Sequence, residues 1–486
     1  MQITVLCRTT KQFVLLGTIL FTLVGCNQSK PISSKSSNSE VIASAKGGDK
    51  VAQFELANRY LNGNGLLKDE KEAVNWFRKS SDQGFIEAQF NLGVCYFWGV
   101  GVPRNQVEAA ALFEKAAERG LPVAQFQLAE CYAKGLGVNK DVNLGVNWLK
   151  KAAAQGIAEA QLDLGSRYLS GEGVAKDEKT GAELIRQSAS NGHSGALYMM
   201  GSCFLHGWGV PINQPEAVIW FSKAATQGDV LATYELAMCY QRGLGVEKNA
   251  TNAILWLRKA AERGYANAQH SLGDSLAEGW GTVANLEQAV KWYRAAAEQG
   301  YSESQYRLGM SYTKGEGLQI DYGQAFLWFQ KAAKNGNATA QYNLGVSFLQ
   351  GKGTQKNETL AFEWLLKAAN QGLSDAQWVV SALYGQGIGT SRNQSESFKW
   401  GQVAANQGVS AAQNYLGISY FDGTNGVNRE VVEGYKWLYL ASERNAEYKL
   451  DLDVRTRGTG ISTEQIEVAK SLAREFGRTN RNQTKQ

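Results

Sequence analysis

The residue types that most often carry chemistry are scarce in this chain of 486 residues. It has three histidines, His193, His206 and His270, and they stand in three unrelated local contexts. The zinc-protease motif H-E-x-x-H, the redox pair C-x-x-C and the serine-hydrolase motif G-x-S-x-G are all absent. We therefore expect no metal, no cofactor and no enzymatic activity.

Four of the six cysteines follow one spacing, at Cys95, Cys131, Cys203 and Cys239. Serine takes the equivalent place later in the chain, at Ser275, Ser311, Ser347 and Ser419. A position shared by Cys and Ser indicates a small packing site. The alternative is a disulfide between equivalent cysteines, but packed helices lie about 8–10 Å apart, and a disulfide needs Cα atoms within about 7 Å.

A fifth cysteine, Cys26, stands in a context that predicts a covalent modification. Arg8 and Lys11 precede an apolar run over residues 13–25, which has the length of a signal peptide and is short for a membrane span. The run ends in Leu-Val-Gly-Cys, which resembles a bacterial lipobox, so Cys26 is expected to carry a diacylglycerol. An ordinary signal peptide with a chance cysteine is the alternative.

The residues after Cys26 predict where the anchored protein is located. Residues 27–39 are rich in Ser and Lys and cannot bury a core, so they are expected to form a flexible tether. Asn27 follows the lipidated cysteine. By resemblance to enteric sorting, the absence of Asp there favours the outer membrane, with the protein on its periplasmic side.

The elements that position the remaining side chains repeat with a fixed period. Eleven glycines lie 36 residues apart: Gly48, Gly84, Gly120, Gly156, Gly192, Gly228, Gly264, Gly300, Gly336, Gly372 and Gly408. A fixed period of this size is typical of a solenoid, in which each unit buries its apolar face only against its neighbours.

Each unit has the pattern of two helices joined by a turn. Ala88, Leu92 and Tyr96 lie four residues apart and share one face of the first helix. The residue after the leucine is Gly, Ala or Ser in every copy, which predicts a neighbouring helix too close for a larger side chain. A Gly-x-Gly turn follows, and its first Gly is expected to end the helix with positive φ. The second helix carries Trp in nine of eleven copies.

The combined pattern resembles the Sel1-like repeat, a relative of the tetratricopeptide repeat. Its form is roughly A-x-x-x-L-G-x-x-Y-x-x-G-x-G-V, then A-x-x-W and A-A-x-x-G, and residues 337–372 match it almost position by position. The resemblance implies an all-α solenoid of about eleven 36-residue helix-turn-helix repeats that binds other macromolecules. It implies no reaction.

Four segments follow from these patterns. We expect a signal peptide over 1–25, a tether with a partial N-terminal cap over 26–47, the repeats over 48–444, and a C-terminal capping helix with a polar tail over 445–486. An extra residue near Gly426 shifts the last repeat. The C-terminal helix is expected to start at Ser462, to bury Ile466, Ala469, Leu472 and Phe476, and to fray after Arg478.

One position of the first helix, two residues after its conserved Ala, is aromatic in eight of eleven copies. The eight residues, the aromatic ladder, are Phe54, Phe90, Phe126, Tyr198, Tyr234, Tyr306, Tyr342 and Trp378. In tetratricopeptide solenoids the first helices line the concave face, so this resemblance predicts a groove for an extended peptide or a sugar polymer. The alternative is that the rings pack between helices.

Charge and motifs narrow the function classes. The net charge of +5 is small for this length, and no basic stripe is present, which argues against nucleic-acid binding. We expect a lipid-anchored scaffold for protein partners in an envelope complex. Resemblance to Sel1-type lipoproteins extends this expectation to a complex for exopolysaccharide secretion. A glycan or peptidoglycan-fragment binder is the alternative. A β-lactam or peptidoglycan hydrolase, known among cysteine-rich relatives, is disfavoured because the paired cysteines are missing.

Overall fold

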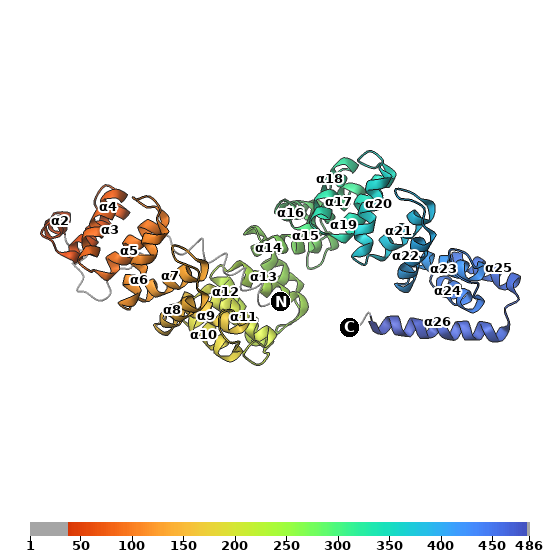
Figure 1. Ribbon diagram of the computed structural model, residues 1–486, viewed down its shortest axis with the longest axis horizontal. Helices are drawn as coiled ribbons and strands as arrows, with labels where there is room; N and C mark the ends of the chain where they lie inside the picture. The colour runs from red at the N-terminus through yellow and green to blue at the C-terminus, as the bar shows by residue number, and fades with distance from the viewer. Residues whose placement is uncertain (1–36, 484–486) are drawn as a thin grey trace. The chain divides into compact units, whose positions relative to one another are not determined.

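The computed structural model describes residues 37–483, which form helices and turns and no strand (Figure 1). The first helices of the repeats, the A helices, are α3 (Lys50–Asn62), α5 (Ile86–Trp98), α7 (Pro122–Lys134), α9 (Ala158–Ser170), α11 (Ser194–His206), α13 (Val230–Arg242), α15 (Ala266–Glu278), α17 (Ser302–Lys314), α19 (Ala338–Gln350), α21 (Ser374–Gln386) and α23 (Ser410–Asp422). The second helices, the B helices, are α4 (Glu70–Asp82), α6 (Gln106–Glu118), α8 (Val142–Ala154), α10 (Glu178–Ser190), α12 (Gln214–Thr226), α14 (Ala250–Glu262), α16 (Leu286–Glu298), α18 (Tyr322–Lys334), α20 (Glu358–Asn370), α22 (Gln394–Asn406) and α24 (Val431–Arg444). The predicted signal peptide, Cys26 and the tether up to residue 36 lie outside the described residues.

The chain divides into two compact units, with the boundary between Ala253 and Ile254 in α14. Within each unit, the A and B helices of a repeat pack on each other, and each B helix also packs on the A helix that follows (Figure 1). Apolar clusters run from one repeat to the next inside a unit, as a solenoid requires. The predicted all-α repeat fold is confirmed.

The Gly-x-Gly turn is required by two separate constraints, both visible at the end of α19. Gly351 ends the helix in the left-handed region, with φ of 68°, and its N–H donates to the Ser347 carbonyl. This confirms the predicted glycine cap. The second glycine, Gly353, also has positive φ, and a Cβ there would lie 1.9 Å from the Tyr322 carbonyl oxygen at the start of α18. The turn of one repeat therefore rests directly on the backbone of the previous B helix.

The small residue inside each A helix also reflects a close approach. A Cβ at Gly309 would lie 2.6 Å from the Phe329 ring of the following B helix. The same clash would arise at Gly201 with Phe221 and at Gly273 with Tyr293. The prediction of a helix packed too tightly for a larger side chain is confirmed.

The B helices from α4 to α22 begin at side-chain caps, whereas α24 begins without one. The Asp321 carboxylate accepts a hydrogen bond from the Gln324 N–H at 2.9 Å, and Asn357 caps α20 in the same way through the Leu360 N–H. Such caps satisfy backbone donors that have no partner within the helix. An Asp or Asn at this position therefore fixes where the B helix starts.

A buried glutamine joins neighbouring repeats, and the sequence analysis overlooked it. In α7, Gln125 donates from Nε2 to the Ala117 carbonyl at the end of α6, at 3.2 Å, and accepts at Oε1 from Gln155, at 2.8 Å. Glutamine occupies this position in nine of eleven repeats: Gln53, Gln89, Gln125, Gln161, Gln269, Gln305, Gln341, Gln377 and Gln413. A buried amide that meets both of its partners contributes to stability and fixes the stacking of the repeats.

In most B helices the repeated Trp is covered by a lysine of the same helix. The Lys79 Nζ lies 3.9 Å from the ring centroid of Trp76, and Lys151 and Lys331 repeat this geometry over Trp148 and Trp328. Trp76 and Trp328 are buried. The Lys of the Lys-Ala-Ala ending therefore shields an indole face by a cation–π contact.

Both ends of the repeats carry additional helices. At the N-terminus, α2 (Asn38–Lys46) places Val41 and Ala45 in the core cluster of the first repeat. At the C-terminus, a short 3₁₀ turn, η1 (Ala446–Tyr448), leads into α25 (Lys449–Thr459), which the sequence analysis did not predict.

The last helix, α26 (Thr463–Gln483), differs from its prediction in two respects. Ser462 and Gln465 exchange capping hydrogen bonds as expected, and Phe476 packs on Trp437. The expected burial of Leu472 is wrong, because Ala473 takes the core position and Leu472 stays exposed. The helix also continues five residues past Arg478. Across residues 37–483, no helix combines the length and the apolar character needed to cross a bilayer.

Candidate interaction surface

The aromatic ladder is covered to different degrees along the chain. Phe54, Phe90 and Tyr198 are buried, with exposed fractions of 2, 8 and 4%. The other five rings are half-buried: Phe126, Tyr234, Tyr306, Tyr342 and Trp378. The packing alternative is favoured for the three buried rings. For the five half-buried rings the groove stays a prediction.

The contacts of the ladder rings explain this burial. Four of the rings turn toward the B helix of their own repeat; the Phe90 centroid, for example, lies 5.5 Å from Phe113 and the Tyr306 centroid lies 6.2 Å from Phe329. Trp378 instead packs on Tyr415 of the next A helix, with the ring centroids 5.8 Å apart. Burial raises the pKa of the Tyr306 and Tyr342 hydroxyls. These ladder rings thus belong partly to the interfaces between helices, and a half-buried ring offers only part of its surface to a partner.

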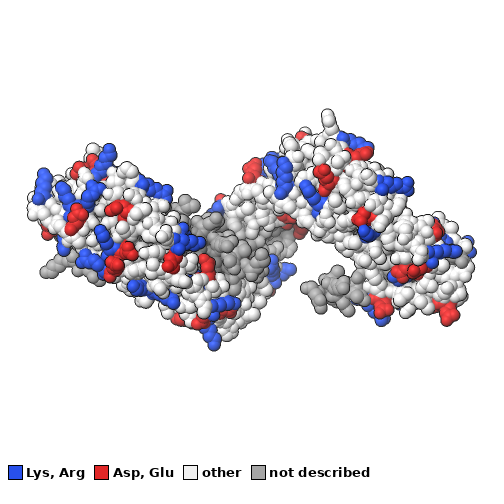
Figure 2. Space-filling model, viewed as in Figure 1, with Lys and Arg blue, Asp and Glu red and all other residues white. Residues whose placement is uncertain are grey.

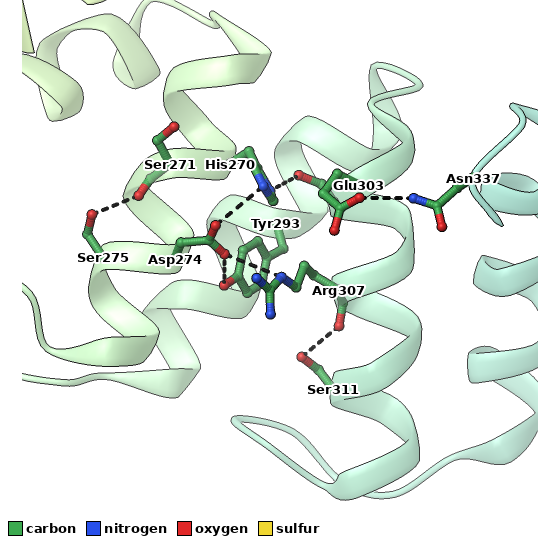
Figure 3. Close-up of polar contacts among 10 residues, drawn as sticks. His270, Ser271, Asp274, Ser275, Tyr293, Glu303, Arg307, Ser311 and Asn337 are labelled. Carbon is green, nitrogen blue, oxygen red and sulfur yellow. Dashed lines mark hydrogen bonds and ion pairs between the residues drawn. The ribbon is translucent and has the colours of Figure 1, made fainter. Parts of the chain in front are cut away.

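His270 replaces the aromatic residue of the ladder in α15 and joins a network of polar side chains (Figure 3). Its Nδ1 lies 3.0 Å from the Ser304 hydroxyl of α17, and its Nε2 lies 3.4 Å from Asp274. The same carboxylate accepts a hydrogen bond from the Tyr293 hydroxyl at 2.7 Å and faces the Arg307 Nε at 3.5 Å. The sequence analysis noted His270 only as one of three scattered histidines and did not find this cluster.

The charge state of His270 follows from its surroundings. Burial lowers its pKa and outweighs the opposite effect of Asp274 and Glu303. The imidazole is therefore neutral near pH 7, with a proton on Nε2 facing the carboxylate and Nδ1 accepting from Ser304. Burial and the hydrogen bond to Asp274 also raise the pKa of the Tyr293 hydroxyl. Asp274 is thus the anionic centre of this cluster, and Arg307 is its cation.

Ser304, His270 and Asp274 stand in the order of a hydrolase triad, but their placement is that of a packing network. Ser304 is fully buried inside α17, with an exposed fraction of 0%, so no substrate carbonyl can reach its hydroxyl. It stands where the other A helices carry the Ala of the apolar face, as at Ala88 and Ala340. The cluster therefore links α15, α16 and α17 and does not present a nucleophile.

The repeated cysteines are inert as well as buried. Burial raises the pKa of Cys95, Cys131 and Cys239 to about 12 in each case. A thiol with such a pKa is protonated at neutral pH and is neither a nucleophile nor a metal ligand. No group of His, Cys, Asp and Glu within residues 37–483 is arranged to hold a metal ion.

The outer surface carries mixed charge. Figure 2 shows Lys and Arg interspersed with Asp and Glu over both units on the face in view. Several of these charges pair locally in the turns, as Lys68 does with Glu70 and Lys356 with Glu358, at 2.9 and 2.8 Å. Exposed pairs of this kind contribute little to stability, so they serve mainly as a solvated surface.

Comparison with known proteins places these features in a family. The Sel1 repeat family matches eleven consecutive segments: residues 50–85, 86–121, 122–157, 158–193, 194–229, 230–265, 266–301, 302–337, 338–373, 374–409 and 410–445. The matched segments cover most of the chain and coincide with the helix pairs described above. No curated protein matches the chain.

Two solved structures illustrate the similarity. The crystal structure of c5321, a protective antigen present in uropathogenic Escherichia coli strains and displaying an SLR fold, shares 34% sequence identity. The match covers 91% of this chain and 94% of c5321, with a TM-score of 0.75. A Sel1 repeat protein from Oxalobacter formigenes shares 30% identity over 50% of this chain and 96% of its own, with a TM-score of 0.45.

Proposed function

From the premise that this chain belongs to the Sel1 repeat family, we propose that it is a lipid-anchored scaffold that binds a protein partner on the periplasmic side of the outer membrane. Repeats of this family generally mediate protein–protein interactions and are typically non-enzymatic. The observation that carries the proposal is the unbroken series of repeats. The side chains in it that could act as nucleophiles are buried. Ser304 and the repeated cysteines cannot meet a substrate, whereas the A-helix surface extends over many repeats.

The anchor in this proposal depends on residues 1–26, and it is supported by their sequence pattern. The similar c5321 is described as a protective antigen, and an envelope location would expose such a protein to the immune system. A role in exopolysaccharide secretion is the narrower form of the proposal. It would be supported if the captured partner were a component of such a system.

The anchor is tested by replacing the cysteine that would carry the lipid. Cys26→Ala should abolish labelling by radioactive palmitate and release the protein from the outer-membrane fraction. Cys7→Ala, which removes the other N-terminal cysteine, is the matched control and should leave both properties unchanged. Equal palmitate labelling of wild type and Cys26→Ala would rule out the anchor.

The scaffold role is tested by crosslinking in living cells. A photo-reactive phenylalanine analogue placed at Gln127, on an A helix, should form a covalent adduct with an envelope protein. The same analogue at Glu118, an exposed residue near the end of a B helix, serves as the control position. Absence of adducts from both positions, and from equivalent positions in the second unit, would contradict a protein-binding role.

A further inference from the structure

Exposed apolar side chains of the first unit gather at one edge of its repeats. The A–B edge is defined here as the last residue of each A helix, the turn that follows and the first two residues of the B helix. Within residues 37–253, four of the five exposed large apolar side chains stand at this edge, and the fifth, Ile219, lies on a B helix. The four are Leu67, Trp98, Val107 and Ile212.

The opposite edge of the same repeats carries no exposed large apolar side chain within residues 37–253. This B–A edge joins each B helix to the next A helix, and its apolar residues are covered. Phe85 has an exposed fraction of 7%, and the equivalent Leu121 and Ile157 are half-buried. The turns of this fold can therefore cover their apolar residues, and at the A–B edge they do not.

Three of the exposed side chains stand in the first two repeats. Leu67, in the turn before α4, has an exposed fraction of 90%, and Val107, in the first turn of α6, has 67%. Trp98 ends α5 and is 48% exposed. The turn of the second repeat rests on the start of α4, because a Cβ at Gly101 would lie 2.1 Å from the Glu70 carbonyl oxygen. The turns of the two repeats therefore adjoin.

The chain enters the described structure at this same edge. Asn38, the first residue of α2, donates from Nδ2 to the Gly65 carbonyl at 2.6 Å, and its Oδ1 accepts from Arg59 at 2.7 Å. Gly65 belongs to the A–B turn of the first repeat and stands two residues before Leu67. The start of α2 is therefore held against the turn that carries Leu67.

Few residues separate this point from the cysteine that would carry the lipid. The eleven residues 27–37 reach at most about 40 Å when fully extended. They include Lys30 and Lys35 and no acid, so an anionic lipid surface attracts them. A lipid on Cys26 therefore keeps the A–B edge of the first repeat within about 40 Å of the membrane surface.

We infer that the A–B edge of the first two repeats lies on the membrane surface, with Leu67, Trp98 and Val107 inserted among the lipid headgroups. The inference rests on the proposed anchor at Cys26 and specifies which surface of the repeats turns toward the bilayer. Side chains that protrude singly from adjoining turns suit a fluid lipid surface, which needs no groove to receive them. Trp also favours this interface, because its ring is apolar and its N–H is polar.

The inference is tested with a fluorescent label on single added cysteines in the full chain, reconstituted into vesicles of equimolar phosphatidylethanolamine and phosphatidylglycerol. The cysteines within residues 37–483 are all buried, so wild type serves as the labelling blank. Leu67→Cys and Val107→Cys are labelled with NBD, and the vesicles carry a doxyl lipid that quenches NBD on contact. Both labels should lose about half of their emission, because interfacial side chains lie about 5–10 Å deep, among the quenchers.

Matched control positions lie at the opposite ends of the same B helices. Asp82 ends α4 and Glu118 ends α6, and both are exposed. Glu118 lies about 16 Å from Val107 along the helix. Labels on Asp82→Cys and Glu118→Cys should lose less than about a tenth of their emission. Equal quenching at all four positions would overturn the inference. A blue shift at position 67 without quenching would show that a second copy or another protein covers the edge, and would overturn it as well.

A further pair of variants separates the apolar side chains from the tether. Leu67→Ser/Trp98→Ser should reduce the quenching at position 107 about twofold, because two of the three inserted side chains are lost. Far-UV circular dichroism should not change, since both side chains are exposed. Ile219→Ser removes an exposed apolar side chain away from the edge and should leave the quenching unchanged. The same quenching in both variants would contradict insertion of the edge.

Flotation of the vesicles separates this inference from the anchor. Wild type that floats with the vesicles but shows no quenching at positions 67 and 107 would refute the membrane-facing edge and leave the anchor intact. Protein that neither floats nor incorporates palmitate would refute the anchor and, with it, the inference.

Discussion

Two glycines in one turn allow a quantitative test of how the repeats are held together. Gly351 and Gly353 both have positive φ, at 68° and 74°, so alanine at either position carries the conformational cost of the left-handed region. That cost is about 1 kcal/mol. The surroundings of the two positions differ. The nearest atom to a Cβ at Gly351 is the Lys356 N at 3.5 Å, an ordinary contact, whereas a Cβ at Gly353 would lie 1.9 Å from the Tyr322 carbonyl oxygen.

The expected destabilisation follows from this difference. Gly351→Ala should cost about 1 kcal/mol, all of it conformational. Gly353→Ala should cost about 3 kcal/mol, because the turn and the first residues of α18 must also move apart, and forced overpacking typically costs about 1–3 kcal/mol. The clash is with backbone, which has no alternative rotamer, so the second cost cannot be avoided by side-chain rearrangement.

Hydrogen exchange is the appropriate assay, because repeat arrays need not unfold as a single cooperative unit. Protection of the amides at the end of α19 should fall slightly in Gly351→Ala. In Gly353→Ala, protection of the same amides should fall further. Protection of the amides in the first turns of α18 should fall as well. The free energies of opening should differ by about 2 kcal/mol between the variants. A difference below about 0.5 kcal/mol would refute the contact between turn and helix as a source of stability.

Three further predictions address single side chains. Arg119 donates to the Gly84 carbonyl and leaves the Oε1 of Gln89 unpartnered, whereas the equivalent Gln155 donates to both the Gly120 carbonyl and the Gln125 Oε1; Arg119→Gln should therefore raise the free energy of unfolding of its region by about 1 kcal/mol in urea titrations, and a loss of stability would contradict this. Burial lowers the pKa of His270, so the unfolded state binds its proton more readily, and wild type should lose stability relative to His270→Phe as pH falls through about 6.5; a difference that is constant between pH 8 and pH 5 would contradict this. Iodoacetamide at pH 8 should leave the native thiols unmodified by mass spectrometry and should label them in urea, at Cys95, Cys131 and Cys239; labelling of the native protein would show that these thiols are accessible.

The sequence predicted those parts of the fold in which only one residue type fits the structure. Only glycine accepts both the φ of Gly353 and the carbonyl beside it, so its recurrence identified the turns. The buried glutamine recurs just as regularly, but a polar residue on a helix is expected to face solvent, and its partners are backbone carbonyls that no sequence pattern reveals.

At the C-terminus, Leu472 and Ala473 both fit helical spacing, and only the space beside α24 decides that the smaller one is buried. In α25, apolar and charged residues alternate around Leu452, a pattern that does not indicate a helix.

The candidate surface was harder to predict because an A helix has neighbours on several sides. Helical spacing placed the aromatic ladder opposite the core, yet Phe54 and Phe90 are covered by the B helix and by the adjoining repeat. The cluster around His270 joins residues of three helices, and nothing in their local sequence links them. Periodicity predicts which positions are equivalent, but it does not predict what surrounds them.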